Sequence, residues 1–381
     1  MDFAFTKEQD ELRDAVIRFA KQELADDVIG RDRGGVFSRE HWKRCAQFGI
    51  QGMPFSDAHG GQGFDVVTTI MVLEALGYAC KDNGLGFGLG AQMWSVQTPI
   101  HEFGTDEQKD RVLTRLCRGE WIGAHAMSEP DSGSDSHAMN TLAVRDGDHY
   151  VLTGSKTFVS SAPLADVFLT FATLGKDKGF LGITGFIVER DSPGVRVSNE
   201  IEKMGLRTDP MAQVFFEECR VPAANRLGRD GQGAAIFRSS MEWERGCIFA
   251  PCVGAMQRQL EACIEHARTR EQFGQPIGKF QAVANRLVDM RVRWETSRAL
   301  LYQMAWTKAH DGKASLESAV AKLHISESWV KNCLDAIQVF GGYGYTTEYE
   351  LERDLRDAVG GTLYSGTSEI QRNLIARHLG L

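Results

Sequence analysis

The sequence predicts an α+β fold in three consecutive parts: a helical domain, a middle β-barrel or β-sandwich domain, and a four-helix bundle. Apolar residues recur at helical spacing through residues 1–121 and again through 231–381. Between them, short alternating or apolar runs are bounded by Gly, Pro, Asp and Asn, which is typical of strands. We therefore expect domains at 1–121, 122–230 and 231–381, since 381 residues suffice for two or three cores.

The first domain is expected to contain a series of helices. Leu12, Val16 and Phe19 repeat at helical spacing, and Ser38 is a plausible N-cap for the next helix. Further helices are expected over residues 66–78 and 91–103. Thr105 begins a capping-box pattern for another helix that ends near residue 119.

The middle and last domains differ in the period of their apolar residues. Strands are expected over residues 149–160, 166–173, 185–189 and 213–217, as in a small sandwich or barrel. One long helix is expected over 232–273, although Pro251 inside it could introduce a kink. Helices over 279–310, 316–340 and 368–378 complete the predicted bundle.

Composition excludes several classes of protein. Acidic residues outnumber basic ones 51 to 43, giving a net charge of −8, and no stretch interleaves basic and aromatic residues. We therefore expect no nucleic-acid partner. No apolar run approaches the roughly 20 residues that span a bilayer, so we expect no membrane association. The acidic N-terminal stretch has no signal-peptide or transit-peptide character, which favours a cytoplasmic location.

The eight cysteines are scattered without a CxxC pair. We interpret them as reduced thiols and expect neither a disulfide framework nor a metal site.

Glu244 is the unusual residue of the long predicted helix. On a helical wheel it falls in the middle of a narrow apolar arc that contains Phe237, Met241 and Ile248. Such a carboxylate indicates an error of register, a partner for a buried cation, or a group kept there for chemistry. Arg245 does not settle the choice, because adjacent residues on a helix do not face each other.

Four motifs occur in a fixed order along the chain. They are MSEPDSGSD at residues 127–135, REQFG at 270–274, QVFGGYG at 338–344 and YSGTSEIQR at 364–372. Each is weak alone, because a Gly pair after a helix is usually a C-cap. In this order, in an α–β–α chain of this length, they resemble the flavin-dependent acyl-CoA dehydrogenases. The stretches WERGC at 243–247, YSGT at 364–367 and IARHLGL at 375–381 look most like the branch that acts on acyl or prolyl groups attached to carrier proteins.

The resemblance implies FAD as cofactor and a homo-oligomer, usually a tetramer built from dimers. FAD would lie extended between the β domain and the bundle, with its adenine end reaching a neighbouring subunit. The positions that match the family's cofactor contacts are Met127, Ser128, Gly133, Ser134, Phe158, Ser160, Arg270, Phe273, Gln338, Gly341, Gly342, Thr367 and Glu369. Ser134, Arg245, Tyr364 and Ser365 are the candidate substrate-binding residues. A guanidinium and open glycine backbone suit a pyrophosphate.

Ser365 departs from the usual pattern of the family, in which a glutamate at this position is the catalytic base. A serine hydroxyl is too weak a base to remove an α-proton. A minority of the family instead carries the glutamate on the long bundle helix, directly before an arginine, and Glu244 with Arg245 matches that pattern. We therefore predict Glu244 as the base, with a raised pKa because it is buried. Glu242, two residues earlier, would face the opposite side.

The implied reaction is α,β-dehydrogenation of an acyl thioester. Glu244 would remove the α-proton while the β-hydrogen leaves as hydride to flavin N5, giving a 2-enoyl thioester. The backbone N–H of Ser365 would still polarise the thioester carbonyl. Electrons would pass to an electron-transfer flavoprotein or to oxygen.

The alternatives concern substrate and class. The thioester could be carried by an acyl or peptidyl carrier protein, or it could be a short or branched acyl-CoA. A carrier protein is acidic, so a basic rim around its docking site would be expected. A flavin oxidase of nitroalkane type would require Asp at the base positions, where the sequence has Ser and Glu. The third possibility is a non-catalytic flavin-binding assembly protein.

Overall fold

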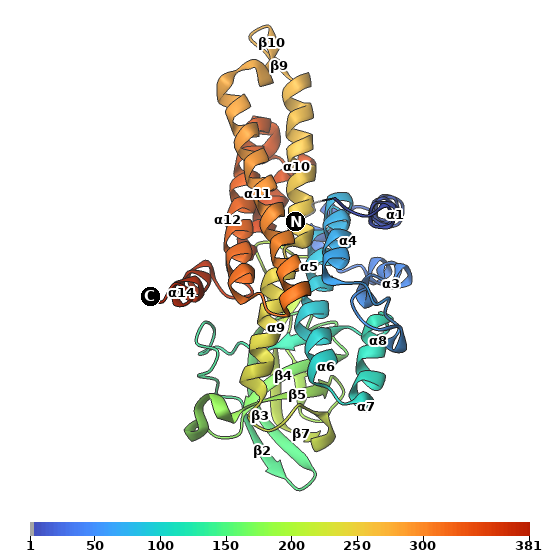
Figure 1. Cartoon of the computed structure of the whole chain (residues 1–381), viewed down its shortest axis with the longest axis vertical. Coiled ribbons are helices and arrows are strands. Elements are labelled where there is room, and N and C mark those ends of the chain that lie inside the picture. The colour runs from blue at the N-terminus through green and yellow to red at the C-terminus, as the bar shows by residue number, and fades with distance from the viewer. Residues whose placement is uncertain (1–3) are drawn as a thin grey trace.

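A computed structural model, which describes residues 4–381, contains a sheet domain at one end, a helical bundle at the other and further helices along one side (Figure 1). The predicted α–β–α order is confirmed. The predicted limits 1–121, 122–230 and 231–381 stay predictions. They fall in the intervals between elements, since α8 ends at Cys117, β1 begins at Gly123 and α9 begins at Gly233. Residues 1–3 lie outside the described part.

The N-terminal helices are specified by local caps. Ser38 accepts a hydrogen bond from the backbone N–H of His41, and Thr105 forms a capping box with Gln108, as predicted. The helix expected over 91–103 begins earlier, where Asp82 caps it, and contains a π-helical turn. The elements are α1 (Lys7–Glu23), α2 (Val28–Gly34), α3 (Arg39–Phe48), α4 (Val66–Ala79), α5 (Asn83–Gln92), the π-turn η3 (Met93–Gln97), α6 (Thr98–Phe103), α7 (Asp106–Gln108), the π-turn η4 (Lys109–Leu113) and α8 (Thr114–Cys117).

The middle domain is one eight-stranded mixed sheet in the order β6-β7-β3-β2-β4-β5-β8, with β1 pairing in parallel with β4. The four predicted strands are present as β3, β4, β5 and β7. Sequence reasoning missed the other four, which are short. The strands are β1 (Gly123–Ala126), β2 (Leu142–Asp146), β3 (His149–Ser160), β4 (Val167–Thr173), β5 (Ile183–Glu189), β6 (Val195–Val197), β7 (Met211–Pro222) and β8 (Arg226–Leu227). A 3-10 segment, η5 (Lys176–Gly182), connects β4 to β5.

The single long helix predicted over 232–273 is wrong. The chain forms α9 (Gly233–Cys247) and α10 (Ala250–Thr269), with a break at Ile248 and Phe249. Pro251 lies in the first turn of α10. A backbone N–H in the first turn has no acceptor within the helix, so proline there costs no hydrogen bond. The break turns α10 away from the sheet, while α9 stays between the sheet and the bundle (Figure 1).

The remaining bundle helices follow the prediction with one addition. They are α11 (Gln281–Asp311), α12 (Ser315–Phe340), α13 (Leu351–Gly361) and α14 (Ser368–His378), and α13 was not predicted. The hairpin of β9 (Glu271–Gln272) and β10 (Gln275–Pro276) covers the end of the bundle farthest from the sheet (Figure 1).

Helix α4 packs closely against α10 and fixes the N-terminal helices on the bundle. A Cβ atom at Gly254 would lie 2.0 Å from the Glu74 carbonyl oxygen, and one at Gly77 would lie 2.0 Å from that of Pro251. Only glycine allows the two backbones to approach this closely. An ion pair between Arg298 on α11 and Glu74 on α4, at 2.7 Å, connects α11 to the same pair of helices.

All eight cysteines are buried and free. Within residues 4–381, no helix is long and apolar enough to cross a membrane, and no group of three or more His, Cys, Asp or Glu is placed to hold a metal ion.

Candidate active site

Glu244 lies on α9 between the N-terminal helices and the C-terminal loop, with 8% of its surface exposed. The Ser365 hydroxyl donates a hydrogen bond to Oε1 at 2.5 Å. The Ser95 hydroxyl, from the π-turn η3, donates to Oε2. Each carboxylate oxygen is thus held by one neutral donor, and the carboxylate joins two segments that are far apart in the sequence.

The pKa of Glu244 is raised because burial disfavours the charged form. Hydrogen bonds from Ser365 and Ser95 oppose that rise, as do the positive charges of Arg245 and Lys322, but they do not cancel it. A buried carboxylate with a raised pKa and neutral donors suits a general base.

Neither an error of register nor a buried ion pair accounts for Glu244. The register is as predicted, because Met241 and Ile248 on the same arc are also buried. No cation lies within ion-pair distance of the Glu244 carboxylate among residues 4–381. Glu242 faces away, as predicted, and forms an ion pair with Lys308 at 2.6 Å.

The loop that carries Ser365 has an uncommon backbone conformation. Ser365 has φ +57° and Gly366 has φ +85°, so the hydroxyl-bearing residue occupies the left-handed region. Arg245 Nε donates to the Ser365 carbonyl at 3.2 Å, and Gln371 Nε2 donates to the same oxygen at 3.1 Å. These contacts hold the loop in position and account for the place of Arg245, whose pKa is lowered by burial.

Tyr364 packs its ring between Phe87 and Phe249, with centroid distances of 4.8 and 5.4 Å. Arg245, Tyr364 and Ser365, predicted from separate motifs, therefore lie around Glu244. The fourth candidate substrate residue, Ser134, lies in an exposed loop of the sheet domain. Binding of substrate by these four residues stays a prediction.

The segment that contains Met127 and Ser128 is held by a buried ion pair. Lys156 Nζ lies 2.8 Å from Glu129 Oε1 and donates to the Met127 carbonyl at 3.1 Å. The Ser128 carbonyl accepts from the Thr157 N–H at 2.8 Å. Next in the chain, Gly133 is exposed, and a Cβ atom there would meet nothing within 4 Å.

Phe158 is exposed through a β-bulge. Lys156 pairs with Val214 and Val159 with Ala212, so β3 has one more residue than β7 in this interval. Phe158, in that interval, has φ +55° and 64% of its surface exposed. The bulge presents a flat aromatic side chain on the sheet, and Ser160 closes the same strand.

A second group of predicted residues lies at the far end of the bundle. Arg270 ends α10 and lies over the Tyr343 ring at 5.8 Å, while Phe273 is 93% exposed in the β9–β10 hairpin. The group also includes Gln338, Gly341 and Gly342, which are exposed. A Cβ atom at either glycine would meet nothing within 4 Å. The structure does not bring this group near Glu244.

The last two predicted cofactor residues begin α14. Thr367 is its N-cap and accepts from the Ile370 N–H at 3.3 Å, and Glu369 is exposed in the first turn. Their contact with a cofactor stays a prediction.

These residues fit a flavin dinucleotide. An exposed aromatic ring at Phe158 offers a flat surface, and the open backbone at Gly133, Gly341 and Gly342 lets N–H groups approach phosphate oxygens. Arg270 supplies a guanidinium, which can bind a pyrophosphate through two hydrogen bonds.

Two residues near Glu244 were missed by sequence reasoning. Ser95 is a polar residue in the apolar run MWSVQ, and that anomaly is the signal that could have identified it. Lys322 on α12 is fully buried, and its Nζ has no hydrogen-bond partner among the described residues. Burial, with the positive charge of Arg245, lowers the pKa of Lys322 to about 8.

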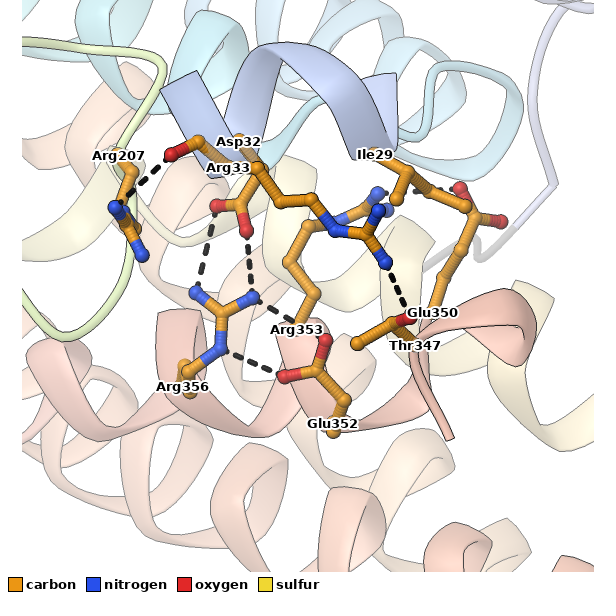
Figure 2. A pocket seen from close by; sticks show the side chains of 9 residues that line it. All are labelled: Ile29, Asp32, Arg33, Arg207, Thr347, Glu350, Glu352, Arg353 and Arg356. Atoms are coloured by element: carbon orange, nitrogen blue, oxygen red, sulfur yellow. Dashed lines mark hydrogen bonds and ion pairs between the residues drawn. The ribbon is translucent and has the colours of Figure 1, made fainter. Parts of the chain in front are cut away.

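A cavity of about 220 Å³ lies elsewhere, between α2 and α13 (Figure 2). Arg356 spans it, bonded to Asp32 and Glu352, while Arg353 pairs with Glu350. Its lining residues are Ile29, Asp32, Arg33, Arg207, Thr347, Glu350, Glu352, Arg353 and Arg356. The Arg356–Asp32 ion pair, which joins the first and third domains, lines this cavity, and none of the predicted site residues does.

The fold and the site define a three-domain α–β–α protein with a buried carboxylate, that of Glu244, held by two hydroxyls between its helical domains. The sequence matches the acyl-CoA dehydrogenase N-terminal domain over residues 6–120, the middle domain over 124–219 and the C-terminal domain over 231–380. The chain belongs to the acyl-CoA dehydrogenase family.

Several relatives match over the full length of the chain. It is 42% identical to an L-prolyl-[peptidyl-carrier protein] dehydrogenase of Pseudomonas fluorescens, with all of both chains covered. Among solved structures, it is 49% identical to the prolyl acyl carrier protein oxidase AnaB, with a TM-score of 0.98 over 99% of this chain and 100% of that one. It is 39% identical to PigA, solved with FAD and proline, with a TM-score of 0.97 and full coverage of both chains.

Proposed function

We propose that this protein is an FAD-dependent dehydrogenase of an L-prolyl thioester carried by a peptidyl carrier protein, with Glu244 as the base. The observation that carries the proposal is the buried carboxylate of Glu244 with a serine hydroxyl bonded to it from position 365. The full-length similarity to prolyl-carrier-protein enzymes supports the choice of substrate.

The residues around Glu244 prepare it for proton removal. Its raised pKa makes it a stronger base than an exposed glutamate, and the Ser95 and Ser365 hydroxyls fix the plane of the carboxylate. When Glu244 takes the α-proton, the electrons of the broken C–H bond form the α,β double bond. FAD, when bound, would be the oxidant, because the β-hydrogen and its electron pair would pass to it.

The loop at position 365 supplies the second element of catalysis. Arg245 and Gln371 both donate to the Ser365 carbonyl, which fixes the Ser365–Gly366 peptide and so restrains the loop. The N–H of Ser365, in the preceding peptide, would stabilise negative charge on the thioester oxygen as the α-proton leaves.

FAD would be held at two places. Met127, Ser128, Gly133, Ser134, Phe158, Ser160, Thr367 and Glu369 would bind its flavin side. Arg270, Phe273, Gln338, Gly341 and Gly342 lie too far from Glu244 along the bundle to complete the same site. We therefore propose a homo-oligomer in which this group binds the adenine side of a neighbouring subunit's FAD. The proposal includes a dimer of dimers and a cytoplasmic location.

A second candidate is an oxidase that uses the same proton transfer but passes electrons to oxygen instead of an electron-transfer flavoprotein. The observation that favours it is the 49% identity to AnaB, which is described as an oxidase.

The central experiment is anaerobic bleaching of the flavin in the purified holoenzyme. The substrates are L-prolyl-carrier protein, L-prolyl-CoA and a short acyl-CoA such as butyryl-CoA. Bleaching by the prolyl-carrier thioester at the lowest concentration supports the proposal, whereas preferential bleaching by butyryl-CoA would replace it with an acyl-CoA dehydrogenase. No bleaching by any thioester would indicate a non-catalytic flavin protein. Reoxidation by air compared with an electron-transfer flavoprotein then identifies the acceptor.

A further inference from the structure

The η5 segment presents apolar and basic side chains to solvent. Phe180 and Leu181 expose 57% and 65% of their surfaces. Lys176 and Lys178, in the same short segment, are also exposed. Two large apolar side chains exposed next to each other form a small apolar patch, and the two lysines form a polar edge to it. An apolar centre with a polar rim is the arrangement of a protein-binding surface.

The outer face of α9 extends this surface toward the bundle. The loop before α9 touches η5, since a Cβ atom at Gly231 would lie 2.3 Å from the Leu181 carbonyl oxygen. Arg238 is exposed one to two turns along α9. Beyond it, Glu242 accepts from the Ala314 N–H at 3.1 Å, which places exposed Lys313 at the end of the same face. We define the η5 rim as Lys176, Lys178, Phe180, Leu181, Arg238 and Lys313.

The η5 rim is positive although the chain has a net charge of −8. None of its four basic residues forms an ion pair within residues 4–381. Nearby acids cancel them only in part: Glu242 is already paired with Lys308, and the two exposed acids Asp177 and Asp311 leave the four basic residues with a net charge of +2. Local positive charge on an acidic protein favours one kind of partner, an acidic one, and steers its approach.

The rim is close enough to the base to serve a tethered substrate. Arg238 precedes Glu244 by six residues on α9, which is roughly 9 Å along a helix at about 1.5 Å per residue. A carrier domain docked there would remain at the surface while its flexible pantetheine arm carries the thioester inward.

We propose that the η5 rim is the docking surface for the acidic carrier domain that delivers the thioester. This inference rests on the proposed function. Its apolar pair would lie at the centre of the interface, with Lys176, Lys178 and Arg238 around it. A pantetheine thioester with no protein or nucleotide part needs the buried site alone and makes no use of an exposed apolar pair.

The test compares two charge-reversal variants of the FAD-loaded enzyme. The rim variant is Lys176→Glu with Lys178→Glu. Its matched control is Arg39→Glu with Lys43→Glu, which reverses two exposed charges on α3. A third variant, Phe180→Ala with Leu181→Ala, tests the apolar pair. Each is assayed with L-prolyl-carrier protein and with L-prolyl-pantetheine, which has no protein part, using a small dye as electron acceptor.

We expect the rim variant to lower kcat/KM for the carrier substrate by about tenfold, mainly through KM, and to abolish its decrease with added salt. The apolar variant should lower the same kcat/KM, and neither should change turnover of the pantetheine substrate by more than about twofold. The control should behave as the wild type with both substrates.

The outcomes separate the two proposals. If wild-type enzyme oxidises the carrier substrate and the rim variant does so equally well, the docking surface is wrong and the proposed function stands. If wild-type enzyme oxidises L-prolyl-CoA but not the carrier substrate, both the carrier assignment and the rim fail. If the rim variant loses activity only when an electron-transfer flavoprotein replaces the dye, the surface binds that flavoprotein and the carrier proposal is overturned.

Discussion

Two buried glutamates, one in the sheet domain and one between the helical domains, differ in the partner that each has. Glu129 is 4% exposed and bonded to Lys156 at 2.8 Å and to the N–H groups of Asn140 and Thr141. Burial alone would raise its pKa, but the charge and hydrogen bonds of these partners hold the pKa of Glu129 below its ordinary value. Glu244 is similarly buried, but its bonded partners are two neutral hydroxyls, and its pKa is raised.

The comparison shows that burial does not by itself make a carboxylate a base. A buried cation favours the ionised form of Glu129 and gives that glutamate a structural role. Neutral donors position the other but leave it able to accept a proton. Substitutions at the two glutamates and at Ser365 test this division of roles.

Glu244→Gln should retain FAD and fold but lower the rate of anaerobic flavin reduction by about 10²–10⁴-fold, because an amide cannot accept the α-proton. Rapid-mixing absorbance of the flavin measures this rate. Glu242→Gln is the matched control on the same helix and should keep near-normal reduction. Near-normal reduction by the Glu244 variant would show that the base lies elsewhere.

Glu129→Gln should leave the chemistry intact where the protein folds but destabilise it by about 3–5 kcal/mol, because Lys156 is then buried without a charged partner. Thermal unfolding followed by circular dichroism measures the change. The exposed pair of Arg196 and Glu217, at 3.1 Å, provides the control, and Glu217→Gln should change stability by less than about 1 kcal/mol. Equal effects of the two variants would contradict the structural role of Glu129.

Ser365→Gly should shift the acidic limb of the kcat/KM–pH profile to higher pH by about one unit. It removes a hydrogen bond that stabilises the ionised form of Glu244, so the base is protonated at higher pH. Glycine also tolerates the left-handed backbone at this position. The control is Ser239→Ala, on the same helix as Glu244. It removes a hydroxyl bonded to Glu102 of α6 and should leave the profile unchanged. A shift to lower pH in the Ser365 variant would contradict the hydrogen-bond assignment.

The smallest predicted effect is on stability as a function of pH. A raised folded-state pKa means that protonated Glu244 stabilises the fold below the unfolded value of 4.5, and this stabilisation is lost as pH rises through the folded pKa. Glu244→Gln should therefore gain stability relative to wild type at neutral pH but not near pH 4. Thermal melts at the two pH values test it. Glu129→Gln should show the opposite trend, since a lowered pKa stabilises the fold above 4.5 and that stabilisation is lost on acidification.

Elements with strong local signals were predictable from sequence. The helix Ser368–His378 and the strand His149–Ser160 have the predicted limits, because a Thr cap and a long alternating run specify them locally. The break between α9 and α10 was underestimated, since Pro251 is compatible with either a kink or a new helix start. Helix α13 was missed because its Arg356 forms an ion pair with Asp32 of α2, a long-range contact that a single segment does not reveal.

The same limit applies to the site. Glu244 could be found because it interrupts an apolar arc within one helix. Ser95 could not be assigned to it, because the two residues are 149 positions apart and meet only after α9 packs on η3. The cofactor residues at the far end of the bundle were identified through a family resemblance and not through any property of a single element.

The hydrogen bond from Ser95 to Glu244 also has a consequence for biogenesis. A donor from the N-terminal helices bonds to a carboxylate of the C-terminal helices, so the proton affinity of Glu244 is set only after the two have docked. A folding intermediate with the N-terminal helices detached would lack the Ser95 hydrogen bond, and the pKa of its Glu244 would differ from that in the folded protein. Maturation of catalytic competence would then lag behind acquisition of secondary structure.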